Sequence, residues 1–199
     1  MSSTPSPTRQ KILNATCQLL EAGDGKAARM SDIAKAAGIS RQALYLHFKT
    51  RGELLVAATR HLEDQLDMPA RLAPSRAAKN GRDRIAAYIR AWAEWMPEVR
   101  NFVSTLLAMA ESDPDAAAAL KDRMSALHHG CTAAIRALEA DGALLAHWDV
   151  ESGADMLWAM VSFGNWRSLT EEKGWSQEVY IAHMTEAALL TFTGKGTGE

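Results

Sequence analysis

The stretch of residues 41–49 holds side chains of the types that contact nucleic acid, at the spacing of one short helix. Leu44 and Phe48 are four residues apart, so they share one side of such a helix and can face a core. The other sides then carry Gln42, Ala43, Tyr45 and Leu46. We expect this outward surface to lie in the major groove of DNA.

The segment before this helix supplies the turn that would position it. Ile33, Ala34 and Ala37 repeat at helical spacing, Gly38 ends that helix, and Ser40 begins the next one. Glycine adopts the left-handed backbone of a tight turn at little cost, and a serine oxygen accepts from free amides at a helix start. Two short helices around a glycine turn predict a helix-turn-helix.

A third helix should cover this pair from the N-terminal side. Ser6 and Pro7 form a cap and a first position for a helix that we expect to reach about Ala22. Its apolar side consists of Ile12, Leu13, Thr16, Leu19 and Leu20. Inert packing of Cys17 among them is favoured over redox or metal chemistry, because one thiol has no partner nearby in the sequence. A turn with two glycines is expected at residues 23–28.

Charge is divided unevenly along the 199 residues. Residues 1–60 hold nine Lys/Arg and four Asp/Glu, whereas residues 61–199 hold thirteen and twenty. A basic first part offers contacts to phosphate and an acidic remainder is repelled by DNA, although a chance difference between two halves would look the same. The polar, proline-broken start predicts no signal peptide and no apolar run of ~20 residues predicts a membrane span. Two cysteines in helical patterns suggest free thiols in the cytoplasm.

These residues occur in an order that resembles the N-terminal domain of the TetR family of transcriptional regulators. The resemblance covers about the first third of the chain and rests on the segments RQKILNATCQLL, SDIAKAAGIS, RQALYLHF and TRGELL. It implies a DNA-binding head of three helices and a larger helical body that usually holds a small-molecule pocket.

The resemblance also implies which side chains contact DNA. The first turn of the recognition helix reaches base edges, where Arg41 suits guanine and Gln42 suits adenine. Leu46 is either a contact to a thymine methyl or plain helix filler, and Tyr45 and His47 either donate to phosphate or pack in the core. The full set is Arg29, Ser31, Ser40, Arg41, Gln42, Ala43, Tyr45, Leu46, His47, Lys49 and Arg51.

A fourth helix is predicted from a capping box formed by Thr50 and Glu53, and it should continue to about Met68. Its amino end would point at the DNA backbone, where the helix dipole favours phosphate. Arg51 stands where the family usually has Lys and keeps the positive charge. The family's usual Thr near the start of the second helix is absent from the sequence ARMS at 28–31, so either Arg29 or Ser31 makes that contact.

The rest of the chain predicts further helices and no strand. Pro69 should close the fourth helix, and the connector RLAPSRAAKNG then separates domains at residues 8–68 and 82–194. Further helices are expected at 83–96, broken by Pro97, from 99 to about 113, from 115 to about 141, at 155–167 and at 179–192. The predicted fold class is all-α, with a three-helix helix-turn-helix domain followed by a larger ligand-binding and dimerisation domain.

The last two helices indicate how the chain assembles. Residues 155–167 and 179–192 are apolar on nearly every side, so each helix must be covered all round. One side can cover the domain interior and the other a second copy, in a four-helix contact. The alternative is that both helices lie at the centre of a monomer.

Large and adaptable side chains in the second domain suit a cavity for an apolar or aromatic effector, although each is also an ordinary core residue. They are Trp92, Trp95, Met96, Phe102, Met109, Met124, Met160, Phe163 and Trp166. His128, His129 and Cys131 do not predict a metal site, because adjacent histidines on a helix diverge by about 100°. No cofactor is expected.

Motifs of catalysis are missing from the sequence, which has no glycine-rich phosphate loop, no H-E-x-x-H and no G-x-S-x-G. We therefore predict a cytoplasmic, homodimeric regulator that is not an enzyme and that binds double-stranded DNA. It would act as a repressor, released from a palindromic operator by its effector. The alternatives are a ligand-carrying or protein-binding helical module without a DNA role, and an all-helical enzyme.

Overall fold

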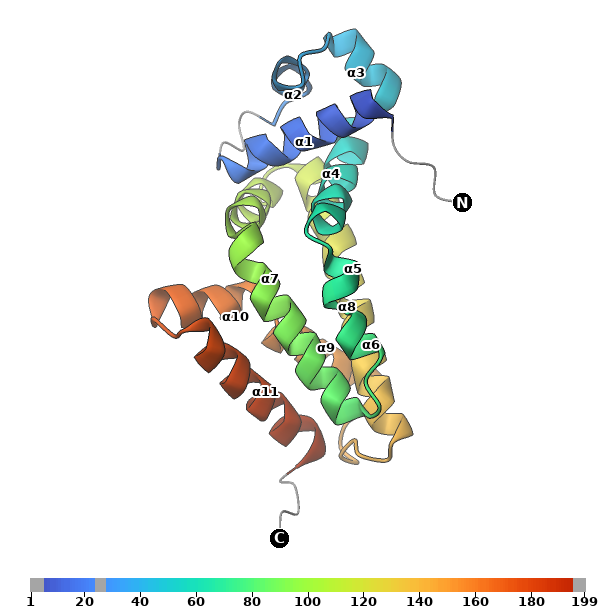
Figure 1. The fold of residues 1–199 in the computed structure, drawn as a ribbon, viewed down its shortest axis with the longest axis vertical. Coiled ribbons are helices and arrows are strands. Elements are labelled where there is room, and N and C mark those ends of the chain that lie inside the picture. The colour runs from blue at the N-terminus through green and yellow to red at the C-terminus, as the bar shows by residue number, and fades with distance from the viewer. Residues whose placement is uncertain (1–5, 24–27, 195–199) are drawn as a thin grey trace. The chain divides into compact units, whose positions relative to one another are not determined.

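The computed structural model describes residues 6–23 and 28–194, which form helices joined by short loops and no strand (Figure 1). The first residues of the predicted tail and four residues of the predicted glycine turn, 1–5 and 24–27, lie outside this description. The all-α prediction is confirmed. Among the described residues no helix is long and apolar enough to cross a membrane. The chain divides into two compact units, one formed by residues up to Leu66 with Val99–Met124, the other by Asp67–Glu98 with the residues from Ser125 onward.

The first unit begins with four helices: α1 (Pro7–Glu21), α2 (Met30–Ala36), α3 (Arg41–His47) and α4 (Arg51–Gln65). The predicted start signals are confirmed, because the Ser6, Ser40 and Thr50 oxygens each accept from an amide three residues on. Gly38 has a φ of 67°, the left-handed conformation that the turn between α2 and α3 requires. Helix α1 packs against α2 and α4, and α2 packs against α3, so the predicted helix-turn-helix and its covering helix are present.

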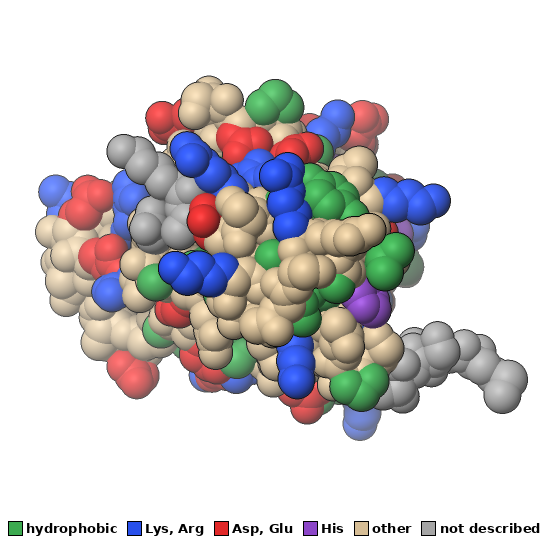
Figure 2. Space-filling view, turned by 90° about the horizontal axis from the view of Figure 1, so that it is seen from above, with side chains coloured by type: hydrophobic (Ala, Val, Ile, Leu, Met, Phe, Trp, Pro, Cys, Tyr) green, Lys and Arg blue, Asp and Glu red, His purple; other side chains and the backbone are tan. Residues whose placement is uncertain are grey.

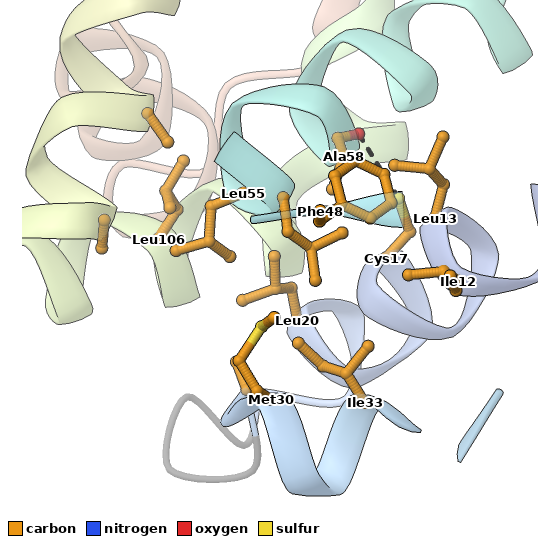
Figure 3. Packing of buried hydrophobic residues seen from close by; sticks show 14 of the residues in the cluster. Ile12, Leu13, Cys17, Leu20, Met30, Ile33, Phe48, Leu55, Ala58 and Leu106 are labelled. Atoms are coloured by element: carbon orange, nitrogen blue, oxygen red, sulfur yellow. Dashed lines mark hydrogen bonds between the residues drawn. The ribbon is translucent and has the colours of Figure 1, made fainter. Parts of the chain in front are cut away.

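The core of the first unit is small and contains fully buried side chains from all four helices and from the residue after α3 (Figure 3). They include Ile12, Leu20, Ile33, Leu44, Phe48, Leu54 and Leu55. The Cys17 thiol donates to the Ala58 carbonyl oxygen over 3.5 Å, and burial raises its pKa to about 12. A thiol that stays protonated and packed is unreactive, which agrees with the packing role predicted for it.

Two long helices contribute to both units: α7 (Gly81–Ala110) and α8 (Pro114–Ala140). Their adjoining ends, residues 99–124, belong to the first unit, where Phe102, Leu106, Ala116 and Ala119 enter the core just described. The sequence places this segment in the second domain instead. The division at residues 8–68 and 82–194 stays a prediction, because it is drawn from the connector and not from packing.

The second unit adds two single-turn helices, α5 (Met68–Arg71) and α6 (Ala73–Arg76), to the remaining parts of α7 and α8. Its C-terminal part comprises α9 (Val150–Met160), α10 (Phe163–Arg167), the π-helix η2 (Ser168–Glu172) and α11 (Gln177–Thr193). Helices α7 and α8 approach closely at two glycines. A Cβ atom at Gly81 would lie 2.5 Å from the Leu138 amide nitrogen, and one at Gly130 would lie 2.4 Å from the Tyr88 hydroxyl.

The predicted break at Pro97 is wrong, since α7 continues through it. Proline has no N–H, so the Ala93 carbonyl oxygen loses its usual partner four residues on. The Gln177 side chain replaces that partner by donating its Nε2 hydrogen to the Ala93 oxygen, and its Oε1 accepts from Trp166 Nε1 over 3.1 Å. A side chain from a distant part of the sequence thus supplies the missing hydrogen bond, and no local sequence pattern predicts this contact.

Two other predicted boundaries also differ from the structure. Helix α4 ends at Gln65, before Asp67 adopts a left-handed φ of 53°, and Pro69 lies inside α5 instead of closing α4. Much of the predicted connector is helical, because it includes the end of α5 and all of α6. The single helix expected at 155–167 is interrupted after Met160, because Ser162 caps a new helix by accepting from the Asn165 amide.

Candidate DNA-binding site

Helix α3 presents side chains that no packing interaction explains. Leu46 is 84% exposed and Tyr45 is 40% exposed, while Leu44 on the opposite side is fully buried. Arg41 and Gln42 are also exposed, and Ala43 is half-buried. A leucine that is open to solvent on a seven-residue helix contributes little to folding, and the choice between a thymine contact and helix filler stays a prediction.

Arg41 and Tyr45 form a pair on this surface. The Arg41 Nη2 donates to the Tyr45 hydroxyl over 3.4 Å, and the guanidinium carbon lies 5.6 Å from the ring centroid. Both side chains are exposed, so this contact is weak and can open when a stronger acceptor is offered. The pair keeps the guanidinium on the outward side of α3, in the first turn.

The C-terminal end of α3 is fixed by a residue that the sequence reading missed. Arg9 of α1 donates from Nη1 to the His47 carbonyl oxygen over 2.9 Å, and its guanidinium carbon lies 4.0 Å from the centroid of the Phe48 ring. A hydrogen bond and a cation–π contact therefore hold the end of the helix. These contacts span about forty positions, so spacing along the chain gives no signal for them.

Further predicted contacts flank α3, namely Ser40, Lys49 and the start of α2. The Ser40 oxygen accepts from the Ala43 amide over 3.0 Å, and the Lys49 side chain is exposed while its backbone N–H donates to Glu53 Oε2 over 3.0 Å. Arg29 and Ser31 are both exposed, and no side chain caps α2. Which of these two contacts the DNA backbone stays a prediction.

Arg51 has a different environment from the one expected. Its Nε donates to the Ala28 carbonyl oxygen over 2.7 Å, and its Nη1 lies 2.7 Å from Asp113 Oδ2 and 3.5 Å from Asp115 Oδ2. Only 19% of its side chain is exposed. These partners neutralise the guanidinium and direct it at the turn between α7 and α8, so the predicted phosphate contact gains no support from the structure.

Further ion pairs join α4 to the first part of α8. Arg60 Nη2 lies 2.7 Å from Asp122 Oδ1, and Arg123 bonds both Asp122 and Glu63. The hydrogen bond from Arg60 lowers the pKa of the Asp122 carboxyl below its usual value. Together with the Arg51 contacts, these pairs fix α4 against the segment 99–124 within the first unit.

The surface near α2 and α3 carries positive charge without being uniformly basic. Figure 2 shows Lys and Arg side chains spread among hydrophobic and uncharged groups on this end, with carboxylates also present. Lys and Arg side chains are the groups that contact phosphate oxygens in protein–DNA complexes, so a phosphate contact on this surface stays a prediction.

The nine side chains proposed for an effector do not form one group. Phe102 and Met109 belong to the core of the first unit, and Met124 is the last residue of that unit. In the second unit Trp92 and Trp95 pack edge to face with centroids 5.2 Å apart, and Phe163 and Trp166 pack at 5.7 Å. Met96 is buried and Met160 half-buried. Trp92 lines a cavity of about 390 Å³.

His128, His129 and Cys131 are not arranged around a common point. His128 Nε2 lies 2.7 Å from Asp155 Oδ1, while His129 is exposed and lines the cavity beside Trp92. Burial raises the pKa of the Cys131 thiol to about 12. In the described part of the chain, no group of three or more His, Cys, Asp or Glu side chains could hold a metal ion.

Comparison with known proteins agrees with this geometry. Residues 12–58 match the model of the bacterial regulatory proteins of the tetR family. A comparison with curated protein sequences finds no match.

Solved structures resemble the whole chain. A TetR-family transcriptional regulator from Rhodococcus sp. is 26% identical, with a TM-score of 0.73 over 92% of this chain and 97% of that one. A transcriptional regulator from Saccharomonospora viridis in complex with choline is 18% identical, with a TM-score of 0.73 over 96% and 100%. NalD of Pseudomonas aeruginosa, the secondary repressor of a multidrug efflux pump, is 18% identical, with a TM-score of 0.69 over 94% and 96%. The N-terminal helix-turn-helix thus matches the tetR family model over residues 12–58, and the chain has the fold of TetR-family transcriptional regulators.

Proposed function

We propose that the protein is a homodimeric repressor that binds a palindromic operator through α3 and leaves it when a small molecule binds the second unit. The observation that carries this proposal is the exposed row on α3, where Gln42, Tyr45 and Leu46 project from a helix fixed at both ends. Such a surface costs solubility unless it has a partner, and its composition fits base edges.

Each exposed residue of α3 has a contact that suits its chemistry. Arg41 can pair with guanine and Gln42 with adenine, while Leu46 can contact a thymine methyl. Tyr45, His47 and Lys49 would contact phosphates beside them, together with Arg29 or Ser31. We leave Arg51 out of this interface, because Asp113 already occupies its guanidinium.

A second copy would cover the apolar side chains that remain exposed in the C-terminal part. Met156 of α9 is 41% exposed, and Val179 and Leu190 of α11 are 40% and 46% exposed. Pairing of α9 and α11 with the same helices of another copy would bury them and generate two recognition helices related by a two-fold axis. Two such helices match a palindrome with half-sites one DNA turn apart.

The packing of the first unit supports the proposal that a ligand releases the DNA. Residues 99–124 lie in the core of that unit and are ion-paired with α4, while the remainder of α7 and α8 belongs to the second unit. A ligand that shifts α7 or α8 would therefore change the position of α3. The choline complex among the similar structures supports a ligand-responsive role. Each ~1.4 kcal/mol of coupling loosens DNA tenfold, and DNA loosens the ligand equally. Such a regulator acts in the cytoplasm, where it meets chromosomal DNA, and needs no enzymatic step.

Selection of DNA from a random pool at fixed, moderate salt tests this function. Wild type should enrich a palindrome, whereas a Gln42→Ala/Tyr45→Ala double variant with unchanged circular dichroism should not. A Gln18→Ala variant serves as the control, because Gln18 is exposed on α1. Failure of wild type to enrich any motif would contradict the proposal and favour a ligand-carrying or protein-binding module.

A further inference from the structure

A cavity of about 390 Å³ lies within the second unit, between α6, α7 and α8. This volume falls in the lower part of the range of small-molecule sites. Its walls are formed by Leu72, Ser75, Arg76, Arg84, Tyr88, Trp92, Ala126, His129, Gly130 and Ala133. The apolar part of the wall consists of Leu72, two alanines and aromatic rings.

The charged groups around the cavity have one sign. Arg76 and Arg84 line it together with His129, and no carboxylate belongs to the lining. Arg84 is half-buried, and its guanidinium forms no ion pair among the residues that the structure describes. Arg76 uses one of its N–H groups on the Pro69 carbonyl oxygen, over 3.2 Å, and keeps the others. Arg76 is exposed and Arg84 half-buried, and both lie in a part of the chain that is acidic as a whole.

The other polar groups of the cavity wall offer a bound molecule more hydrogen-bond donors than acceptors. The Ser75 hydroxyl donates to the Arg84 carbonyl oxygen over 3.0 Å, and the Tyr88 hydroxyl donates to the Leu127 carbonyl oxygen over 2.8 Å. Burial raises the pKa of Tyr88, so this hydroxyl keeps its proton. Trp92 is 9% exposed, and its Nε1 is buried without a hydrogen-bond partner in the described chain. Arginine and tryptophan donate only, so an occupant must bring the acceptors.

We propose that this cavity binds a small carboxylate on an aromatic or apolar body. The carboxylate would accept from Arg84, with Arg76 beside it, and the body would lie against Trp92 and Leu72. Bidentate pairing of a guanidinium with a carboxylate is strong in a partly buried site. This proposal adds a negative charge to the predicted effector, which the sequence analysis describes only as apolar or aromatic. Its regulatory meaning rests on the function proposed above, whereas the binding itself does not.

Titration of the full chain with matched probes tests the inference without DNA. Benzoate, phenylacetate and 2-naphthoate are compared with their neutral amides and with benzylamine, a cation of similar size. Binding is followed by calorimetry and by the indole N–H resonances, where a Trp92→Phe variant identifies the Trp92 signal. Each carboxylate that binds should do so about tenfold more tightly than its amide, and should shift the Trp92 signal. Benzylamine should not bind.

Substitutions separate the arginines from general effects on folding. The Arg84→Gln variant should weaken carboxylate binding about tenfold and leave amide binding unchanged, and Arg84→Lys should restore part of the loss. Arg136→Gln, on the exposed side of α8 and outside the cavity lining, is the matched control and should bind like wild type. Thermal unfolding of every variant checks that the second unit remains folded.

The possible results distinguish this inference from the proposed function. If no carboxylate of the panel binds at millimolar concentration, or if carboxylates and amides bind equally, the inference is wrong, and DNA binding is unaffected by that result. If carboxylates bind and Arg84→Gln weakens their binding while carboxylates leave operator affinity unchanged, the site is established and its coupling to DNA is contradicted. If Arg84→Gln binds carboxylates as tightly as wild type, the inference is wrong.

Discussion

The two units place their functional groups in opposite ways. In the first unit the candidate DNA contacts are exposed on a seven-residue helix whose ends are fixed by Ser40 and Arg9. In the second unit the candidate groups, Arg84 and Trp92, line a cavity among three helices. A rigid exposed helix suits a large, repetitive partner such as DNA, whereas a partly enclosed cavity suits a small ligand. The first kind of site is set by local sequence and the second by packing between distant segments.

The largest effect should come from removing one phenylalanine in each unit. Phe48 and Phe192 are both fully buried, and replacing either by alanine should cost about 3–5 kcal/mol. Because Phe48 lies at the end of α3 in a small core, Phe48→Ala should abolish operator binding. Phe192→Ala should instead weaken the second unit and leave α1–α4 protected in amide hydrogen exchange. Equal loss of protection in both units would show that they unfold as one.

Removal of the Gln177 side chain should have the next largest effect. The Gln177→Leu variant leaves the Ala93 oxygen and the Trp166 nitrogen without partners, at a cost of about 1–3 kcal/mol in unfolding free energy. In a Pro97→Ala background position 97 regains an N–H, so the same substitution should cost less. Urea unfolding of the two single variants and the double variant measures the difference. An unchanged cost would mean that Gln177 does not compensate for the proline.

Ion pairs in the two units should differ in coupling energy, because they differ in burial. A double-mutant cycle with Arg51→Met and Asp113→Asn should give a coupling of about 1 kcal/mol, since both side chains are mostly buried. The same cycle on Arg90 and Glu94, a pair with exposed side chains in α7, should give only a few tenths of a kcal/mol. Equal couplings would remove Arg51 from its structural role and return it to the candidate DNA contacts.

The smallest expected effect is on the pH dependence of the melting temperature. Burial lowers the pKa of His61, whose Nε2 lies 2.6 Å from Asn14 Oδ1. A histidine with a lowered folded-state pKa contributes stability that is complete above the unfolded pKa of about 6.5 and is lost as the pH falls below it. The melting temperature of wild type should therefore fall slightly more than that of His61→Gln between about pH 7.5 and about pH 5.5. A steeper fall in the variant would contradict the assignment.

The sequence predicts most of the first unit because its signals are local. Ser6, Ser40 and Thr50 begin helices where expected, and Gly38 turns the chain. The exposure of Leu46 follows from its phase relative to Leu44. The sequence does not predict the contacts of Arg9 with His47 or of Arg51 with Asp113, because these partners lie far along the chain and neither contact follows a helical period.

The second unit resists such prediction for the same physical reason. Pro97 breaks a helix by any local rule, yet Gln177 satisfies the carbonyl that it leaves free. Phe102 and Met109 are residue types that often line ligand pockets, but both pack into the core of the first unit. The cavity appears only where α6, α7 and α8 meet, so neither its arginines nor its volume could be derived from spacing.

The most direct test of the account is the affinity of the chain for the selected DNA site and for a scrambled duplex, measured at two salt concentrations. Wild type should prefer the selected site, and Gln42→Ala should lose about 1–3 kcal/mol of that preference while binding the scrambled duplex as before. Gln18→Ala should retain the full preference. If Gln42→Ala discriminates as well as wild type, α3 does not read the operator and the central claim is contradicted.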